Sequence, residues 1–552
     1  MFFDNPKLDN IEKLLSEHGA QNIHVTSITK DWVNLKFDFL INTQQVCLGL
    51  IFQNRANWTI PPIFRILTRP MSALDHVSQS GEICTTDHQG ENFEGYRHKE
   101  LITEFFERAI DILKQSFINF QLNNRVSLYN ELEGYLGSTQ NINEDVILHC
   151  DPTSTFNLYG WLRKSSKWNH QILEHIDDGD SSYINHNQLT KVKIHKILLE
   201  DASVFPIPDI GDYFNEDYFL KIVNTLSNEN KRSLLKQGNH YALVGIPNEH
   251  GFAYVIFYYA IWYSFKEKVS FKGFKVSLTQ RAWIDYLLNR TGQEKKTRHI
   301  AIIGCGALGS KIAEILAQTG VNKFSFIDPE LLKTDNIYRH SLGLQYVNTY
   351  KSTSLANKFL IERPGLTIFP FVSHGESWIK SKITEDIDTI IIAIGHTPTE
   401  ISLVKTIYEI SANIQVIIGW LEPYDLGGHF ISFNNKYVGC LNCLYFDEKS
   451  NKSLTPMYKY VQSGQLIAKN ITGCAGAFTP FSSLNCMKLA SYISEYVLNQ
   501  QLGFVSISGD NQNANKNGII TTPFYNSVNN SNGINILNLK EIYKEVCPCC
   551  NT

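Results

Sequence analysis

Apolar and polar residues alternate along residues 22–53 in three short runs, which are broken at "TKDW" and "NTQQ". Because a period of two residues is typical of β-strands with one buried face, this segment is predicted to form an antiparallel meander. An extended segment, "WTIPPIFRIL", and a polar loop around Cys84 follow, and "HKELITEFFERAIDILKQSF" then has apolar residues at helical spacing. Residues 1–120 are therefore predicted to form an α+β domain of helix, meander, cysteine loop and helix.

The pattern changes in the C-terminal half, where apolar runs such as "RHIAIIGCG", "KFSFID" and "DTIIIAIG" alternate with helix-like segments. This alternation predicts a parallel sheet with crossover helices, a Rossmann-like fold, over residues 276–552. Residues 121–275 mix strand-like runs with polar turns and hold no motif that indicates a reaction. They are interpreted as a central α/β connecting domain, so the chain is predicted to be a multidomain α/β protein.

Length and composition agree with several folded domains. The 552 residues exceed what one core accommodates, and 43% hydrophobic residues, 19% charged residues and a net charge of -4 are typical of a soluble protein without a nucleic-acid partner. No apolar run is long enough to cross a membrane and no secretory signal begins the chain, so a cytoplasmic location is expected. Thiols stay reduced there, and the eleven cysteines are expected to be metal ligands, nucleophiles or core residues.

A glycine-rich turn marks the first strand of the C-terminal domain. In "IAIIGCGALGSKI" a buried strand runs into Gly304, Gly306 and Gly309 and then into a helix. Glycines at these positions allow a tight turn and close approach of a phosphate to the helix N-terminus. Asp328 ends the next strand, where a carboxylate can accept hydrogen bonds from ribose hydroxyls. The segment therefore predicts a nucleotide site.

The residues after Asp328 indicate which nucleotide binds. A triphosphate carries more negative charge than a dinucleotide pyrophosphate, and Arg339 and Lys351 follow, with Asn336 as a polar partner. Each of these charges taken alone could instead be a solvated surface group. Together they favour ATP.

Two pairs of cysteines have the spacing of metal ligands. Cys440 and Cys443 form one C-x-x-C pair, and Cys547 and Cys550 form a second near the end of the chain. Four thiolates can hold a structural Zn²⁺ tetrahedrally. Cys549 is left over, and the alternative is that these C-terminal cysteines are incidental.

The run "GCGALGS…AQTGVNKFSFIDPELLKTDNIYRH" resembles the adenylating domain shared by ubiquitin-activating enzymes and the sulfur-carrier activators ThiF and MoeB. The resemblance implies that ATP activates the C-terminal carboxylate of a protein as an acyl-adenylate. It implies that the three glycines and Asp328 hold the nucleotide and that Asn336, Arg339 and Lys351 meet its phosphates. The same family carries the two cysteine pairs.

The sequence departs from this family at one position. The family places an Asp that supports Mg²⁺ at the end of the fourth strand, where this chain has Gly395 and His396. Either Mg²⁺ is held otherwise or the activity is altered. An upstream arginine, Arg281 or Arg290, is a further candidate to reach ATP.

Cys474 lies between the two cysteine pairs, in "NITGCAGAFTPFSS". Ubiquitin-activating enzymes carry a thioester-forming cysteine in this part of the adenylating domain, and Cys474 is the position that matches. Sulfur is a strong nucleophile even at low thiolate fractions, so Cys474 could capture an acyl-adenylate. Cys486, in a helix-like segment, is interpreted as a core residue.

The polar loop around Cys84 resembles the active site of the ubiquitin-conjugating fold. There, a strand with a Pro-Pro pair leads to a His and then to Gly-x-Ile-Cys, as in "WTIPPIFRIL" and "HVSQSGEIC". The resemblance implies that Cys84 is a second nucleophile and His76 a catalytic residue, although His76 could be structural. The asparagine that normally steadies the oxyanion is missing, with Ser78 nearby.

The order of these parts resembles the activating-conjugating fusion of bacterial anti-phage CBASS operons. That family implies adenylation, a thioester at Cys474, transfer to Cys84 and ligation to a target amine, with a cGAS/DncV-like nucleotidyltransferase as substrate and a homodimer as the assembly. A separate ubiquitin-like carrier is an alternative substrate. Two further alternatives are an NAD-dependent oxidoreductase, which leaves Arg339, Lys351 and both cysteines without a role, and a nucleotide-binding scaffold.

Overall fold

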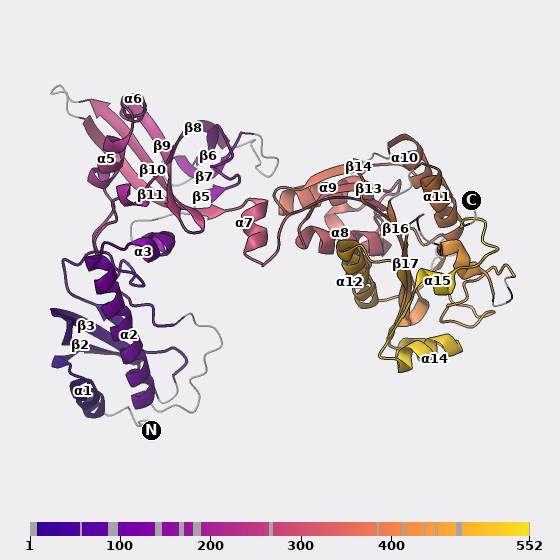
Figure 1. Cartoon of the computed structure of the whole chain (residues 1–552), viewed down its shortest axis with the longest axis horizontal. Helices are drawn as coiled ribbons and strands as arrows, with labels where there is room; N and C mark the ends of the chain where they lie inside the picture. The colour runs from indigo at the N-terminus through magenta and orange to yellow at the C-terminus, as the bar shows by residue number, and fades with distance from the viewer. Residues whose placement is uncertain are drawn as a thin grey trace. The chain divides into compact units, whose positions relative to one another are not determined.

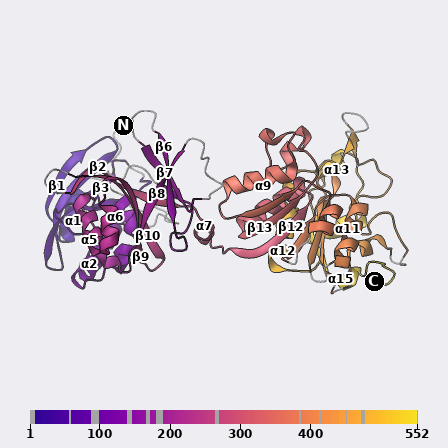
Figure 2. The same ribbon diagram turned by 90° about the horizontal axis from the view of Figure 1, so that it is seen from above.

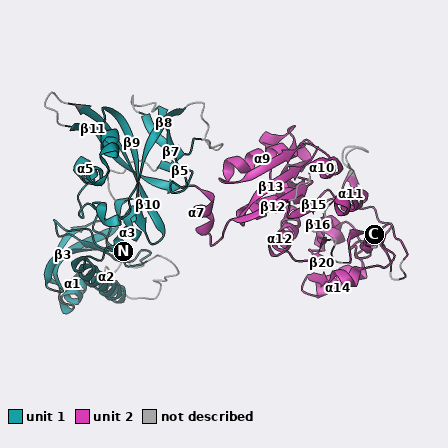
Figure 3. Ribbon diagram, turned by 45° about the horizontal axis from the view of Figure 1, so that its top comes forward, with its two compact units in different colours: residues 1–282 teal, residues 283–552 magenta. Residues whose placement is uncertain are grey.

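The computed structural model divides the chain into two compact units, residues 1–282 and 283–552 (Figure 3). A further boundary near residue 120 stays a prediction. The structure describes the chain except for residues 1–7, 56–57, 87–97, 138–145, 165–170, 180–188, 264–268, 383–385, 411–413, 435, 437, 448, 450, 471–476 and 551–552.

The predicted meander is confirmed in the first unit. Its four strands form an antiparallel sheet in the order β1-β2-β3-β4, and α1 and the long helix α2 pack against it (Figures 1 and 2). The buried residues of α2, such as Ile102 and Leu113, face the sheet residues Leu48 and Phe64 within one apolar cluster. The elements are α1 (Leu8–Glu17), β1 (Gln21–Ile28), β2 (Trp32–Ile41), β3 (Gln44–Gln53), β4 (Ile63–Ile66) and α2 (His98–Gln121).

The rest of the first unit centres on a closed β-barrel, which the sequence pattern did not predict. Its strands follow the order β10-β11-β5-β7-β6-β8-β9, and β9 closes the ring by pairing with β10. One apolar cluster continues from the meander through the helices into the barrel. The elements are α3 (Val126–Asn130), α4 (Leu132–Gly137), β5 (Val146–Leu148), β6 (Leu158–Lys164), β7 (Gln171–Asp177), β8 (Leu189–Leu198), η2 (Ala202–Val204), α5 (Glu216–Thr225), α6 (Asn228–Leu234), β9 (Gly238–Asn248), β10 (Gly251–Tyr263) and β11 (Val269–Arg281).

The second unit contains the predicted parallel sheet. Strands β14-β13-β12-β15-β16 are parallel, and β17, β20 and β21 extend the same sheet in antiparallel pairing. The main elements are α7 (Ile284–Asn289), β12 (Lys296–Ile303), α8 (Ala307–Gln318), β13 (Val321–Ile327), α9 (Lys351–Glu362), β14 (Thr367–Phe371), α10 (Gly375–Lys382), β15 (Thr389–Ile392), α11 (Thr397–Ile410), β16 (Gln415–Leu421), β17 (Gly427–Phe433), α12 (Ser483–Asn499), β20 (Gly503–Ser508) and β21 (Ile534–Leu537).

Helices cover both faces of this sheet, which explains why the second half of its central strand β12, residues 300–303, is wholly apolar. Ile300 and Ile302 pack in the cluster that contains α8, α9 and α12. Ala301 and Ile303 pack in the cluster that contains α10 and α11. The carboxyl ends of the parallel strands therefore meet at one edge, where open α/β sheets bind their ligands.

Short elements complete the second unit: η3 (Thr334–Arg339), η4 (Leu344–Tyr346), η5 (Pro423–Asp425), η6 (Leu441–Tyr445), β18 (Lys469–Asn470), β19 (Ala477–Phe478), α13 (Gln512–Lys516), α14 (Pro523–Asn530) and α15 (Leu539–Ile542). Among the described residues, no helix combines the length and apolar character that a membrane span requires.

Candidate functional site

A cavity of about 730 Å³ lies at the carboxyl ends of β12, β13, β15 and β16. Four of the seven residues predicted to hold the nucleotide line it: Gly306, Asn336, Arg339 and Lys351. The other three predicted residues, Gly304, Gly309 and Asp328, are not among the residues that line the cavity. The sheet thus brings together at one edge residues from three separate loops.

The three glycines serve two purposes. Gly304 has a φ of +94°, and a Cβ there would lie 2.7 Å from the carbonyl oxygen of Ala393. A Cβ on Gly309 would lie 2.0 Å from the carbonyl oxygen of Gly304, so these two glycines allow the loop and helix α8 to pack closely. Gly306, at the N-terminus of α8, has open space where its side chain would be. A phosphate can approach the unpaired N–H groups of α8 at this point.

The carboxylate of Asp328 accepts hydrogen bonds from backbone N–H groups of the loops around it. Its Oδ2 accepts a hydrogen bond from the N–H of Cys305 at 2.8 Å, and its Oδ1 accepts one from the N–H of Glu330 at 2.8 Å. Burial raises the pKa of this carboxyl group. The geometry therefore favours a role for Asp328 in shaping the loop, and its contact with the ribose stays a prediction.

Glu330, which the sequence analysis did not single out, is the carboxylate of this loop that lines the cavity. Its Oε2 lies 2.5 Å from the Nζ of Lys351, a buried lysine at the start of α9. The hydrogen bond from Lys351 lowers the pKa of Glu330. In the sequence, the only signal for Glu330 as a residue of the site is its position just after the end of a strand.

The second predicted cation is held by an aromatic ring. The guanidinium carbon of Arg339 lies 5.4 Å from the centroid of the Phe481 ring, and both residues line the cavity. Asn336 accepts a hydrogen bond from the N–H of Lys333 through its Oδ1, at 3.2 Å. Lys351 and Arg339 together give the cavity two positive charges that an anionic phosphate chain can meet.

Two further carboxylates line the cavity near the place where the family's Mg²⁺-supporting Asp is missing. Gly395 donates its N–H to Glu400 at 2.9 Å, and burial raises the pKa of Glu400 to about 7. The Oε1 of Glu422 lies 3.2 Å from the Nε2 of the buried His429. His396 is exposed and its Nδ1 contacts Thr399. Carboxylate oxygens are the donors that Mg²⁺ prefers, so Glu400 and Glu422 fit this ion.

The two cysteine pairs converge in the second unit. The sulfur atoms of Cys440, Cys443, Cys547 and Cys550 all lie within 4.8 Å of one another. Two of the separations, Cys440–Cys547 at 3.7 Å and Cys443–Cys550 at 3.5 Å, are close to the roughly 3.8 Å edge of a tetrahedral zinc–thiolate site. Both far exceed a disulfide bond. Cys549 is buried nearby but is not one of the four. The donor set fits Zn²⁺.

Cys474 lies outside the described residues. The two short strands that flank the undescribed residues, β18 and β19, pair with each other. Cys486 lies on α12 with no exposed surface, and burial raises the pKa of its thiol to about 12. This is the core position expected for Cys486.

Cys84 lies at the end of a tight turn in the first unit. Its backbone N–H donates to the carbonyl oxygen of His76 at 2.8 Å, and the turn between them is closed by a hydrogen bond from the N–H of Ser78 to the oxygen of Glu82. The side chain of Cys84 is exposed, and its Sγ lies 3.6 Å from the carbonyl oxygen of Thr86. The thiol borders a cavity of about 550 Å³.

His76 and Ser78 also line this second cavity. The Nδ1 of His76 lies 2.6 Å from the Oε1 of Glu131, and this hydrogen bond raises the pKa of the imidazole. The Oγ of Ser78 accepts the N–H of Glu82 at 3.0 Å. Glu131, between α3 and α4, was missed from sequence because it lies far along the chain from His76 and belongs to no motif.

Neither upstream arginine lines the cavity of about 730 Å³. Arg281 ends β11 in the first unit, and its Nη2 lies 2.7 Å from the Oε1 of Glu133. Arg290 follows α7 and is exposed. A contact between either arginine and ATP stays a prediction.

Comparison with known proteins assigns the second unit to a family. The ThiF family matches residues 281–518. The "ATP-dependent ubiquitin transferase-like protein Cap2" of Escherichia coli is 25% identical over 215 residues, which are 37% of this chain and 36% of that protein. Its namesake from Pseudomonas aeruginosa is 24% identical over 225 residues, 39% of this chain and 38% of that protein. The alignments thus span little more than a third of each relative.

A crystal structure of E. coli MccB has 18% sequence identity and a TM-score of 0.33, and the match covers 46% of this chain and 65% of that one. The family match includes the glycine loop, the cavity of about 730 Å³ and the first cysteine pair. Residues 281–518 of this chain form a ThiF family domain.

Proposed function

We propose that this chain uses ATP to activate the C-terminal carboxylate of a protein and then ligates it to an amine through two thioesters. The proposal is carried by one observation: Gly306 at the start of α8, Arg339 and Lys351 line a single cavity at the ligand-binding edge of the sheet. The relatives named as ATP-dependent ubiquitin transferase-like proteins support the same chemistry.

In the first step, a carboxylate oxygen of the substrate attacks the α-phosphorus of ATP and pyrophosphate leaves. The N–H groups at the start of α8, with Lys351 and Arg339, would neutralise the charge on the phosphates. Glu330 would accept hydrogen bonds from the ribose. Glu400 and Glu422 would hold Mg²⁺, which supplies further charge neutralisation when bound.

The Cys474 thiolate then attacks the acyl carbon and AMP leaves. Cys84 takes the acyl group by thioester exchange, which breaks the bond to the Cys474 sulfur and forms one to Cys84. A target amine finally attacks the Cys84 thioester and releases the thiolate. Zn²⁺ at the four cysteines would tie the end of the chain to the domain and take no part in these steps.

The substrate we favour is the C-terminus of a cGAS/DncV-like nucleotidyltransferase, in the CBASS anti-phage response of a bacterial cytoplasm, with the enzyme acting as a homodimer. A separate ubiquitin-like carrier is the second candidate. The genes next to this one distinguish the two, because the substrate of such a system is expected to be encoded beside its enzyme. The ThiF family match and the presence of Arg339 and Lys351 in the cavity favour ATP over NAD.

The test is incubation with ATP and the candidate substrate, followed by a non-reducing gel. The wild-type protein is expected to form a thiol-labile adduct, Cys84→Ala to hold it at Cys474, and Cys474→Ala to form none. A nucleotide-binding scaffold would instead keep full function after both substitutions. An adduct that persists in both variants overturns the assignment of the two cysteines.

A further inference from the structure

The carboxylate of Glu131 holds His76 at two points. Its Oε1 lies 2.6 Å from the Nδ1 of the ring, and its Oε2 accepts the backbone N–H of His76 at 3.1 Å. His76 has a backbone φ of 55°, a value that residues other than glycine rarely adopt. The strained backbone and the two contacts with Glu131 indicate that the fold holds the imidazole ring in one orientation.

The contact with Glu131 also fixes which ring nitrogen can accept a proton. Because Nδ1–H donates to Glu131, the lone pair of the neutral ring is on Nε2. No hydrogen bond to Nε2 is found within the described part of the chain. His76 is half exposed, so a substrate group can reach this nitrogen.

The ring and the thiol share one cavity. His76, Glu131 and Cys84 all line the space of about 550 Å³, and the hydrogen bond from the Cys84 N–H to the His76 carbonyl fixes the distance between their backbones. The described lining has apolar walls that include Pro61, Pro62 and Leu128, carries the carboxylates Glu82 and Glu131, and has no lysine or arginine. Such a cavity suits a cationic group better than an anionic one.

We infer that His76, oriented by Glu131, is the base that takes a proton from the acceptor at Cys84, and that the acceptor is a primary ammonium such as a lysine side chain. This inference rests on the proposed function. The proton of the ammonium passes to Nε2, the neutral nitrogen attacks the acyl carbon, and the bond to the Cys84 sulfur breaks. The leaving sulfur takes the second proton of the attacking nitrogen and departs as the thiol, and the imidazolium, stabilised by Glu131, returns its proton to water.

The charges around His76 agree with a base role. The hydrogen bond to Glu131 has the largest effect on the pKa of His76, which is raised, and Asp75 acts in the same direction. Glu82 is paired with Arg65 at 2.9 Å, and Asn119 of α2 donates to Asp75 at 2.7 Å. A more basic imidazole accepts a proton from an ammonium group more readily.

The experiment loads Cys84 with substrate, removes ATP and measures discharge of the thioester by free lysine across pH 6–9. We expect His76→Ala to slow discharge at pH 7 by about 10²-fold. Glu131→Gln is expected to slow it about tenfold and to move the rising limb of the pH profile to lower pH, because the imidazole loses the partner that raises its pKa. Glu249→Gln, an acid that bonds Asn130 and lies outside the cavity, is the matched control.

Hydroxylamine separates a base from a structural residue. It is neutral at pH 7 and needs no prior deprotonation, so its reaction with the Cys84 thioester should be nearly equal in wild type and His76→Ala. Equal slowing with both nucleophiles, or unchanged lysine discharge in both variants, overturns the inference. If wild-type Cys84 never carries the thioester, the proposed function fails instead.

Discussion

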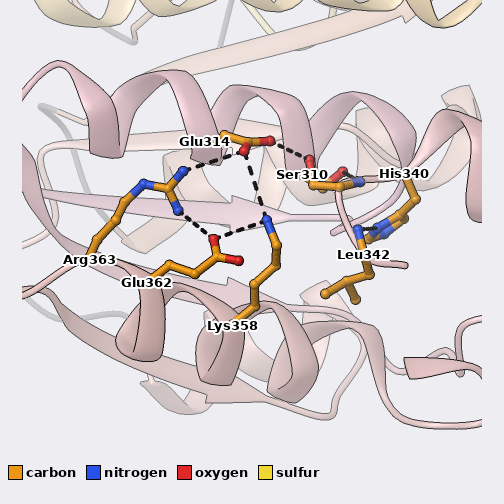
Figure 4. A network of polar contacts seen from close by, with 8 residues as sticks. Ser310, Glu314, His340, Leu342, Lys358, Glu362 and Arg363 are labelled. Atoms are coloured by element: carbon orange, nitrogen blue, oxygen red, sulfur yellow. Dashed lines mark hydrogen bonds and ion pairs between the residues drawn. The ribbon is translucent and has the colours of Figure 1, made fainter. Parts of the chain in front are cut away.

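The Nε2 of His340 donates a hydrogen bond to the carbonyl oxygen of Cys305 at 2.6 Å. Its Nδ1 accepts the N–H of Leu342 at 3.0 Å (Figure 4). His340 follows Arg339 directly, whereas Cys305 lies inside the glycine loop. Burial lowers the pKa of His340 to about 4, so the ring stays neutral and keeps this donor–acceptor pattern at neutral pH. The histidine therefore ties the glycine loop to the segment that carries Arg339, the two segments proposed to bind phosphate.

A network of charges supports the same segment. Glu314 of α8 accepts the hydroxyl of Ser341 at 2.8 Å, and it also contacts Arg363 and Lys358 of the α9 region at 3.4 Å and 3.9 Å (Figure 4). Ser341 in turn donates its N–H to Ser310 at 3.3 Å. Helices α8 and α9 thus hold the segment that carries Arg339 and His340.

We expect His340→Ala to raise the dissociation constant for ATP about tenfold, a loss of one to two neutral hydrogen bonds. His340→Gln should retain much of the affinity, because a glutamine amide can donate from a position near Nε2. Isothermal titration with ATP measures the effect, and the Tm of each variant shows whether the fold persists. His250→Ala, an exposed histidine in the first unit, is the control. Equal affinities for the Ala and Gln variants would contradict the hydrogen-bond argument.

The ion pair between Lys351 and Glu330 leads to a second prediction. Lys351→Ala should reduce ATP–pyrophosphate exchange by about 10²-fold, because a buried positive charge at the proposed phosphate site is lost. Lys358→Ala, on the same helix but outside the cavity, should leave exchange within twofold, because Arg363 still pairs with Glu314 when Lys358 is lost. If both variants lose exchange alike, damage to α9 rather than loss of phosphate contact explains the result.

Local patterns were sufficient to predict the elements that carry these residues. The period-two alternation of residues 22–53 indicated the meander, and apolar runs ending at Gly304 and Asp328 indicated parallel strands. A C-x-x-C spacing places two sulfur atoms in one short turn. A single long-range contact between the two turns is therefore enough to bring all four sulfur atoms together. The signal for each single strand, and for each single cysteine pair, lies within about ten neighbouring residues.

Other features depend on contacts that sequence spacing does not reveal. The barrel depends on pairing β5 with β11 and β8 with β9, strands that lie far apart along the chain, and no periodicity encodes these pairs. Glu131 contacts His76 although 55 positions separate the two residues along the sequence. Asp328 and Glu330 are both acids after one strand, and only the geometry shows that backbone N–H groups occupy the first while the second lines the cavity.

The third prediction concerns the four converging cysteines. We expect one Zn²⁺ per chain by elemental analysis and a drop in Tm on treatment with a chelator, since binding energy at such a site is folding energy. Cys547→Ser should lose the metal, whereas Cys549→Ser, a buried neighbour outside the four, should keep it. Retention of full zinc content by Cys547→Ser would mean that the four sulfurs are not the ligand set.

The fourth prediction follows from the buried carboxyl group of Glu400. Burial is the largest cause that raises its pKa, from 4.5 to about 7, while the N–H of Gly395 acts in the opposite direction. Between about pH 4.5 and 7, Glu400 is therefore protonated in the folded state and ionised in the unfolded state. Its contribution to the free energy of unfolding becomes less favourable to the folded state as pH rises through that window. The full effect, on the order of 3 kcal/mol, is reached above pH 7.

Glu400→Gln removes this titration and keeps a carbonyl oxygen that can accept the Gly395 N–H. The Tm of the second unit in the wild-type protein, measured without nucleotide, should fall by several degrees more than that of the variant between pH 5 and pH 8. Glu376→Gln, an exposed acid on α10 that bonds Ser402, should follow the wild-type curve. Parallel curves for wild type and Glu400→Gln would show that Glu400 is ionised throughout the range, and that a cation or an added hydrogen bond stabilises its charge.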